Sequence, residues 1–191
     1  MKKLNSKGFT LIELLAVITI MGILMLVAIP AVSRTIENSR RDTFMDTALA
    51  YINAAKNAVA ADELYVGDSP ISAQEAGYYY YGFDTSSGNT ATDLMEQGGK
   101  SSWGNSNVQG YIAIQKKVSA SDGRTSYVYA IRLIDTAKRG ITTLTLEKKL
   151  KRSSVVTSSD VDQVMAPAGS DYDAFSGVTL TADNCKALSI G

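Results

Sequence analysis

The sequence contains no histidine and only one cysteine, Cys185, in 191 residues. Without histidine, every Ser-His, Cys-His and histidine-metal mechanism is excluded. A single cysteine can form neither an internal disulfide nor a multi-cysteine zinc site. The chain also lacks an excess of charge of one sign, because 19 basic residues balance 19 acidic ones. This balance argues against a general nucleic-acid coat protein, although a local basic patch stays possible.

A long apolar run stands near the N-terminus. Residues 9–32 read FTLIELLAVITIMGILMLVAIPAV and contain a single charged residue, Glu13. As a helix, this run would be about 36 Å long, which is enough to cross a hydrocarbon core of about 30 Å. Three lysines precede the run in MKKLNSKG and favour a cytoplasmic N-terminus, although arginines also follow it at positions 34, 40 and 41.

Two ordinary explanations of this run leave features unexplained. A secretory signal peptide has a shorter apolar stretch and a small-x-small cleavage site, and Ile29-Pro30-Ala31 is a poor one. An uncleaved signal anchor has no use for Glu13, because burying an ionised carboxylate costs several kcal/mol unless it is paired. Glu13 therefore needs a partner.

The segment Lys7-Gly8-Phe9-Thr10-Leu11-Ile12-Glu13 and the apolar run after it resemble the class III leader of type IV pilins and pseudopilins. The resemblance covers about residues 1–40. It implies that a membrane peptidase cuts after Gly8 on the cytoplasmic side and that the new N-terminal residue, Phe9, is N-methylated. Glu13 is then the fifth residue after the cut, and Pro30 matches a proline that the family usually has about twenty residues after it.

The resemblance also implies how the subunits assemble. The glutamate of one subunit, here Glu13, is thought to meet the terminal amine of its neighbour during filament assembly. An ion pair in a low dielectric specifies register, because a slip leaves two unpaired charges. Removal of residues 1–8 takes away three lysines, so the mature chain has 16 basic and 19 acidic residues and a formal charge of −3.

The helix is expected to continue beyond the membrane, from Phe9 to near Ala61. Apolar residues recur at helical spacing in its second half and predict a stripe that carries a globular domain. Gly22 and Pro30 weaken the helix: by resemblance it melts between them in filaments, whereas a kink at Pro30 is the simpler expectation. The residues of the stripe are Phe44, Ala48, Ile52, Ala55 and Val59, with Met45 and Leu49 beside them.

The rest of the chain predicts a sheet with loops on either side. Glycines and small polar residues predict a loop over residues 62–109, in which the run Tyr78–Tyr81 would bury alternate rings. Three alternating segments, 111–118, 126–134 and 141–150, predict an antiparallel meander. Beyond residue 152 the chain is again rich in Ser, Asp and Gly, with a possible short strand at 177–181, and it is expected to cover the sheet edge.

These observations predict an α+β, type IV pilin-like fold, in which a long N-terminal helix packs against an antiparallel β-sheet of three to four strands. The expected segments are a leader peptide (1–8), a transmembrane and filament-core helix (9–32), an amphipathic helix half (33–61), a helix-to-sheet loop (62–109), an antiparallel sheet (110–152) and a C-terminal region covering the sheet (153–191).

No motif predicts catalysis or a cofactor. Gly98-Gly99-Lys100-Ser101 lacks the first glycine of a P-loop, because Leu94 stands in its place. The aspartates near the C-terminus could form a calcium site, but the preferred interpretation is that they are solvated surface residues. No metal is therefore predicted. The acids are Asp160, Asp162, Asp171, Asp173 and Asp183.

The sequence therefore predicts a structural subunit and no enzyme: a pilin that polymerises into a homo-oligomeric type IV pilus for adhesion, motility or surface contact. By resemblance, its partners are a prepilin peptidase/methyltransferase, an assembly ATPase and a platform protein. The precursor would sit in the inner or cytoplasmic membrane and the assembled pilus outside the cell.

Three alternatives remain. They are a pseudopilin of a type II secretion-like system, a competence pilus subunit for DNA uptake and an unprocessed signal-anchored surface protein. DNA capture would use a basic cluster made of Lys116, Lys117, Lys148, Lys149, Lys151 and Arg152.

Overall fold

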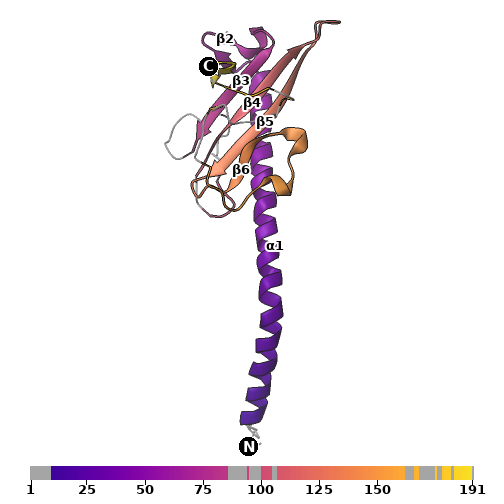
Figure 1. Cartoon of the computed structure of the whole chain (residues 1–191), viewed down its shortest axis with the longest axis vertical. Coiled ribbons are helices and arrows are strands. Elements are labelled where there is room, and N and C mark those ends of the chain that lie inside the picture. Colours follow the sequence, from indigo (N-terminus) through magenta and orange to yellow (C-terminus); the bar gives the residue numbers. More distant parts are fainter. Residues whose placement is uncertain are drawn as a thin grey trace, which may run out of the picture. The chain divides into compact units, whose positions relative to one another are not determined.

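A computed structural model describes residues 10–85, 94, 100–104, 107–161, 166–167, 175, 178–181 and 183–190. The chain divides into two compact units, Met1–Ser39 and Arg40–Gly191. One α-helix, α1 (Leu11–Ala60), contributes to both units, and the strands lie in the second (Figure 1).

Helix α1 confirms the expected long helix to within two residues at each end and runs through Pro30 without interruption. In the second unit it buries Phe44, Ala48, Ile52, Ala55 and Val59, the five residues predicted to form its apolar stripe. Tyr51 and Ala58 extend this stripe, and the Tyr51 ring stacks on Phe83 with 4.4 Å between centroids.

In the part of the chain that the structure describes, five strands form the main sheet, in the order β6-β5-β4-β3-β7. Three neighbouring pairs are antiparallel: β4–β5 and β5–β6, as the meander predicts, and also β3–β4. Strand β7 runs parallel to β3. The strands are β3 (Gly77–Asp84), β4 (Val108–Val118), β5 (Thr125–Asp135), β6 (Gly140–Leu146) and β7 (Cys185–Ala187).

A smaller sheet has the order β2-β1-β8. Its strands are β1 (Leu64–Val66), β2 (Ser69–Pro70) and β8 (Ser189–Ile190). Because β1 follows α1 and β8 closes the chain, this sheet joins the end of the helix to the C-terminal segment.

The main sheet is covered on both faces. One face packs against the stripe of α1 through Tyr79, Tyr81, Ile112 and Ile114, and Figure 1 shows the second half of α1 lying behind the strands. On the other face, Tyr111, Ala113 and Ala130 form a second cluster with Phe175, Leu180 and Cys185 of the C-terminal segment. This segment also supplies β7 to the sheet edge, as expected of a region that covers it.

Three expectations need correction. The segment 62–109 is not one loop, because it contains β1, β2, all of β3 and the start of β4. The third predicted strand ends at Leu146, and residues 147–149 form the 3-10 helix η3. Residues 178–181 form no strand, and Gly177 lies outside the described residues.

The tyrosine run confirms the predicted alternation. Tyr79 and Tyr81 are buried on the helix face, whereas Tyr78 and Tyr80 are half-buried on the other. Tyrosine and β-branched residues fit a pleated, half-buried surface, which explains why this segment forms a strand despite its glycines.

Candidate functional site

The N-terminus of α1 is closed by Thr10 and Glu13. The Glu13 carboxylate oxygen Oε2 accepts hydrogen bonds from the Thr10 backbone N–H and from Thr10 Oγ1, both at 2.8 Å. The Glu13 backbone N–H donates in return to Thr10 Oγ1 at 3.3 Å. This reciprocal pattern is a capping box, in which an N-cap Thr and an acid three residues later satisfy backbone donors that the helix leaves unpaired.

The box places Glu13 in the first turn of the helix, where a negative charge is favoured by the helix dipole. Gly8 and Phe9, the expected cleavage and methylation residues, lie outside the described residues. The bond between them precedes Thr10 in the sequence. A cut there would keep both partners of the capping box in the mature chain.

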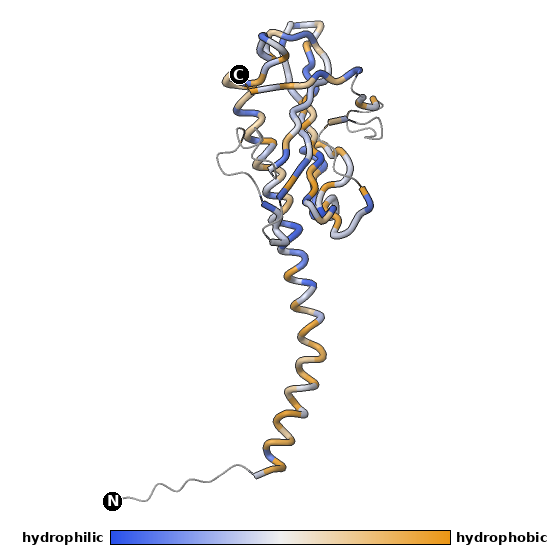
Figure 2. Tube along the Cα trace, turned by 90° about the vertical axis from the view of Figure 1, so that its left-hand side faces the viewer, coloured by the Kyte–Doolittle hydropathy of each residue, from blue (hydrophilic) through white to orange (hydrophobic). Residues whose placement is uncertain are grey.

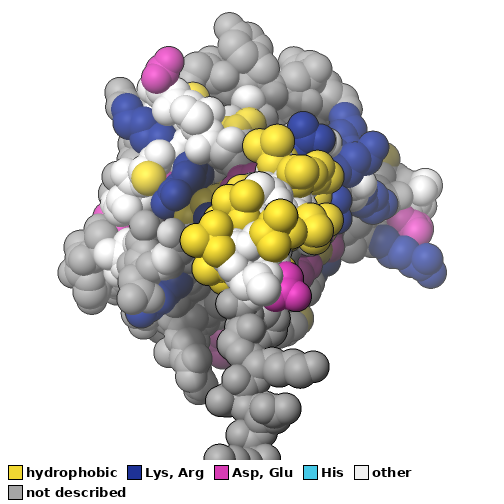
Figure 3. All heavy atoms as spheres, turned by 90° about the horizontal axis from the view of Figure 1, so that it is seen from below, with side chains coloured by type: hydrophobic (Ala, Val, Ile, Leu, Met, Phe, Trp, Pro, Cys, Tyr) yellow, Lys and Arg dark blue, Asp and Glu magenta, His cyan; other side chains and the backbone are white. Residues whose placement is uncertain are grey.

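The helix that follows presents apolar side chains to its surroundings on all sides. Its large apolar side chains are at least half exposed: Leu11, Ile12, Leu14, Leu15, Val17, Ile18, Ile20, Met21, Ile23, Leu24, Met25, Leu26, Val27, Ile29 and Val32. Figure 2 shows this part of α1 as predominantly hydrophobic, and Figure 3 shows apolar side chains gathered together. A helix that is apolar all round belongs in a membrane or in a bundle of helices.

Helix α1 is long and apolar enough to cross a membrane, with a mean hydropathy of 2.7 over its most apolar window. Hydroxyl groups within the helix return their hydrogen bonds to its own backbone. Thr19 Oγ1 donates to the carbonyls of Leu15 and Ala16, and Thr35 Oγ1 donates to Ala31. A Cβ built at Gly22 would meet nothing within 4 Å in the described part of the chain, which leaves that position open to a neighbour.

Comparison with known proteins gives one match. Residues 3–29 match the prokaryotic N-terminal methylation motif. No curated protein and no solved structure matches the chain. The matched segment includes Gly8, Phe9, Glu13 and Gly22, and it ends one residue before Pro30.

The match and the fold agree: the matched motif leads an apolar helix long enough to cross a membrane, and the fold is a pilin-like α+β arrangement of that helix and an antiparallel sheet. The N-terminal segment is the class III prepilin leader of the type IV pilins and pseudopilins. This leader implies processing by a prepilin peptidase.

The basic cluster considered for DNA capture does not form one surface. Lys116 is buried, and its Nζ donates to the carbonyls of Ile71, Ser72 and Gln74 at 3.1, 2.6 and 2.6 Å. Burial lowers the pKa of this ammonium group. Lys117 follows it in β4 and therefore belongs to the opposite face of the sheet. The predicted cluster was chosen by charge alone. It did not take into account that alternation along β4 places Lys116 on the buried face despite its charge.

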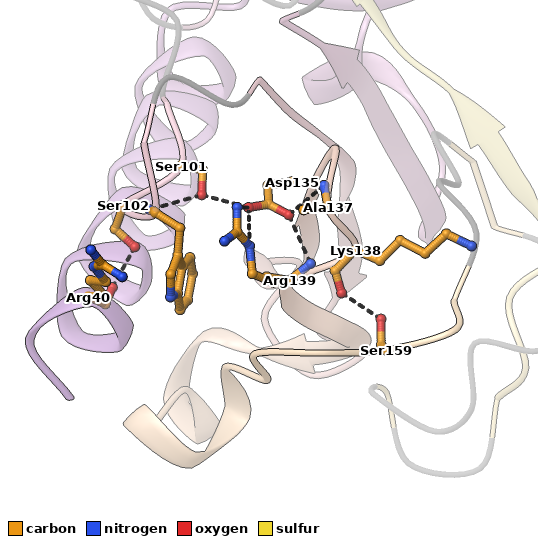
Figure 4. A network of polar contacts seen from close by, with 9 residues as sticks. Arg40, Ser101, Ser102, Asp135, Ala137, Lys138, Arg139 and Ser159 are labelled. Atoms are coloured by element: carbon orange, nitrogen blue, oxygen red, sulfur yellow. Dashed lines mark hydrogen bonds and ion pairs between the residues drawn. The ribbon is translucent and has the colours of Figure 1, made fainter. Parts of the chain in front are cut away.

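A polar network at Asp135 holds the β5–β6 turn and was not predicted (Figure 4). Asp135 is fully buried, and its carboxylate accepts hydrogen bonds from Ser101 Oγ and Arg139 Nε at 2.8 Å each. It also accepts from the backbone N–H groups of Ala137 and Arg139, both at 2.9 Å. Nearby, Ser102 Oγ donates to the Arg40 carbonyl at 2.6 Å, which ties this loop to α1. An acid followed by a turn is the only sequence signal for it.

Within the residues that the structure describes, the remaining candidates form no site. Of the five C-terminal acids, Asp162, Asp171 and Asp173 lie outside the described residues, and Asp160 and Asp183 are exposed. Among the residues that the structure describes, no three His, Cys, Asp or Glu side chains come together to hold a metal. Burial raises the pKa of the Cys185 thiol to about 12, so this cysteine is a small core residue rather than a nucleophile.

Proposed function

We propose that this chain is a structural subunit of a type IV pilus, made as a prepilin that is cut between Gly8 and Phe9 and N-methylated at Phe9. The observation that carries the proposal is the methylation motif at residues 3–29, which runs directly into a capped helix with apolar side chains on all sides. The mature subunits polymerise into a helical filament for adhesion, motility or surface contact.

Polymerisation is energetically feasible because a filament offers the helix the same kind of environment as lipid. The exposed apolar side chains between Leu11 and Val32 would leave the membrane and pack against the same segment of neighbouring subunits. Burial of apolar surface is non-directional, so neighbouring helices can replace lipid without exposing this surface to water. An assembly ATPase and a platform protein supply the work of extraction.

Glu13 gives the filament its register. Both hydrogen bonds from Thr10 fall on Oε2, and the carboxylate has a second oxygen, Oε1, for a further donor. We assign that donor to the cationic Phe9 amine of a neighbouring subunit, which exists only after the cut at Gly8. In an apolar filament core, a subunit out of register would leave both charges unpaired, and that penalty selects one arrangement.

The first test is the N-terminus of the protein in sheared surface material from its host, determined by mass spectrometry. An N-methylated Phe9 in sheared fibres is the expected result. An intact Met1, found only in the membranes of a host with an active prepilin peptidase, would contradict the proposal and leave a signal-anchored protein. Recovery of methylated subunits from a periplasmic secretion apparatus, with none on the surface, would point to a pseudopilin instead.

A second test separates the charge of Glu13 from its capping role. Glu13→Gln keeps a side chain that suits a capping box but removes the charge. Thr10→Val removes the hydroxyl and keeps the charge. We expect Glu13→Gln to reduce the yield of sheared filaments at least about tenfold, because the unpaired neighbouring amine is left in an apolar core. Thr10→Val should assemble at a higher yield than Glu13→Gln, and the opposite order would show that the cap, rather than the ion pair, is what assembly needs.

A further inference from the structure

Strand β6 ends before its neighbour β5 does. The last pair between them is Ala130 with Leu146, after which the chain turns away into η3 (Glu147–Lys149). Strand β5 begins at Thr125, so its residues 125–129 lie beyond that last pair, and Figure 1 shows the β4–β5 hairpin running on past the end of β6. Within the described part of the chain, no strand pairs with residues 125–129 on the side that β6 leaves open. We call this stretch the open edge.

The backbone groups of alternate residues along the open edge point away from β4. The Ser119 N–H donates to the Arg124 carbonyl at 2.9 Å, and these two residues are opposite each other in the register of β4 and β5. Hydrogen bonds alternate along an antiparallel pair, so Thr125, Tyr127 and Tyr129 direct their N–H and C=O groups outward. Tyr127, near the middle of the open edge, therefore presents a donor and an acceptor to an added strand.

A cavity of about 260 Å³ lies where β6 would continue. Its apolar lining comes from both sides of the sheet. Tyr127 and Tyr129 belong to the face that packs on α1, whereas Val128 and Leu146 belong to the opposite cluster. Successive side chains of a strand point to opposite faces, so an added strand would find apolar contacts on each side.

Positive charge faces one end of this cavity. Lys56 of α1 and Lys148 of η3 line it together with Glu147. Glu147 forms an ion pair with Lys56, whose Nζ also lies 5.7 Å from the centre of the Tyr129 ring. Lys148 is exposed, and among the described residues no ion pair includes it. A carboxylate on an added strand would therefore complement this end of the cavity.

The chain after β6 is anchored, which keeps the cavity open. The Glu147–Lys56 pair ties η3 to the helix. Further along, Arg152 binds Asp42 through two hydrogen bonds, from Nε at 2.6 Å and from Nη2 at 2.5 Å. Leu150, between these two contacts, packs against the main core. These contacts prevent residues 147–152 from extending β6 along the open edge.

The open edge lacks the features that usually protect the edge of a sheet. Residues 125–131 read TSYVYAI, without a charged residue or a proline, and their aromatic and β-branched residues favour strands. At the other side of the sheet, the edge strand β7 has three residues and includes the exposed Lys186. An unprotected edge can pair with an extended peptide through main-chain hydrogen bonds.

We propose that the open edge binds an extended, acidic peptide segment of another protein, which adds to β5 as a strand in the position that β6 leaves vacant. The segment runs in the direction of β6, so its acidic residue is at its N-terminal end, beside Lys148. A peptide is favoured over a compact ligand because the outward backbone groups of alternate β5 residues match the repeat of another strand. The inference goes beyond the pilus subunit proposed above and does not rest on cleavage at Gly8, so either can fail without the other.

The test uses the full-length chain in micelles of a zwitterionic detergent and a fluorescein-labelled peptide. The peptide is an acetylated aspartate followed by alternating valine and threonine, with the fluorescein at its C-terminal end. Fluorescence anisotropy measures the Kd, and empty micelles give the background. Replacement of the aspartate by asparagine should raise the Kd at least about threefold, because the carboxylate no longer meets Lys148.

Two N-methylated forms of the peptide test whether its backbone pairs with the open edge. One form carries methyl groups on every second amide, and the other carries them on the remaining amides. Only alternate amides of an added strand face β5, so one form should bind at least about tenfold more weakly and the other within about threefold of the parent. Equal affinities of the two forms would overturn the proposal.

The variant is Lys148→Glu, and the matched control is Lys149→Glu. Lys149 is exposed in the same helix η3, and among the described residues it is not one of those that line the cavity. We expect Lys148→Glu to raise the Kd of the aspartate peptide at least about fivefold and Lys149→Glu by less than about twofold. Equal effects of the two variants would contradict a site at this cavity, because the response would then be one of net charge.

Hydrogen exchange followed by mass spectrometry locates the bound peptide. The amides of residues 125–131 should exchange more slowly when the peptide is present, because strand addition gives the outward N–H groups a partner. Slower exchange at β7 instead would place the peptide at the wrong edge. If residues 125–131 are already protected in the chain alone and lose that protection on dilution, a second copy of the chain occupies the open edge and the proposal is wrong.

Discussion

At the scale of single residues, Lys116 shows how a basic side chain becomes part of the core. Its ammonium group donates to the backbone carbonyls of Ile71 and Ser72 in the short helix η1 (Ile71–Ala73) and of Gln74, which follows that helix. Lys116→Met would keep the length of the side chain and leave these carbonyls without their donor. We expect the free energy of unfolding to fall by about 2–3 kcal/mol, because hydrogen bonds to a charged group are worth more than neutral ones.

The measurement for Lys116→Met is denaturant unfolding in detergent, followed by Trp103 fluorescence. Lys117→Met is the matched control, since this neighbour is exposed on the opposite face of the sheet. The control should change the free energy by no more than about 0.5 kcal/mol. Equal effects of the two substitutions would mean that the carbonyl contacts of Lys116 add nothing to stability.

Gly110 is a second residue whose identity is set by its surroundings. It lies in β4 opposite Leu133 of β5, and a Cβ at this position would stand 2.0 Å from the backbone oxygen of Arg132. Backbone atoms of a central strand have little room to move, so we expect Gly110→Ala to destabilise the domain by more than about 3 kcal/mol. Gly77→Ala in β3 is the control, because its Cβ would meet only the Tyr79 ring at 3.7 Å or more. Comparable unfolding midpoints for the two variants would contradict this account.

At the scale of elements, local periodicity predicts α1 and the three strands β4, β5 and β6 well. The spacing of Phe44, Ala48 and Ile52 is visible in the sequence, and the helix buries these residues as predicted. Strand β3 escapes prediction because glycines at Gly77 and Gly82 resemble loop composition, while its stability comes from pairing with β4 more than twenty residues away. The parallel pairing of β7 with β3 joins residues still further apart, and no local pattern encodes it.

The same limit applies to the candidate site. Gly8, Phe9 and Glu13 stand in one short motif, so their roles are predicted from the sequence without any knowledge of the fold. The capping contact of Glu13 with Thr10 follows from their spacing of three, which is another local signal. The ion pair of Asp42 with Arg152 joins residues 110 positions apart, and it becomes visible only once the fold is known.

The Asp42–Arg152 pair predicts how firmly the segment 147–154 is held. Asp42→Asn removes the charged partner, and trypsin should then cut after Lys149 and Lys151 a few-fold faster, because cleavage requires local opening. Asp46→Asn changes an exposed acid one turn further along the helix and should leave the rate unchanged. The pair is open to solvent, so high salt should accelerate cleavage of the unchanged chain as well. Identical cleavage rates for Asp42→Asn and the unchanged chain would show that the pair does not hold the segment.

At the scale of the whole molecule, the two units differ in where their apolar side chains lie. The first, Met1–Ser39, contains no buried residue among those that the structure describes. Its exposed apolar side chains can contact lipid or other subunits. The second, Arg40–Gly191, contains both hydrophobic clusters, the first of which begins at Phe44. Assembly can therefore change the surroundings of the first unit without disturbing the core of the second.

This division predicts that residues 40–191 form a soluble, folded fragment without the membrane-spanning run. We expect it to elute as a monomer and to unfold cooperatively, with a free energy close to that of the same unit in the full chain, as measured by Trp103 fluorescence. A fragment of residues 53–191 is the control, because it lacks Phe44, Ala48, Tyr51 and Ile52, all of which are fully buried. Burial of the three larger side chains contributes roughly 5–9 kcal/mol, which is comparable to the total stability of about 5–15 kcal/mol that a domain has. The control should be unfolded or aggregated. If fragment 40–191 behaves in the same way, the second unit depends on residues before Arg40 and the two units do not fold independently.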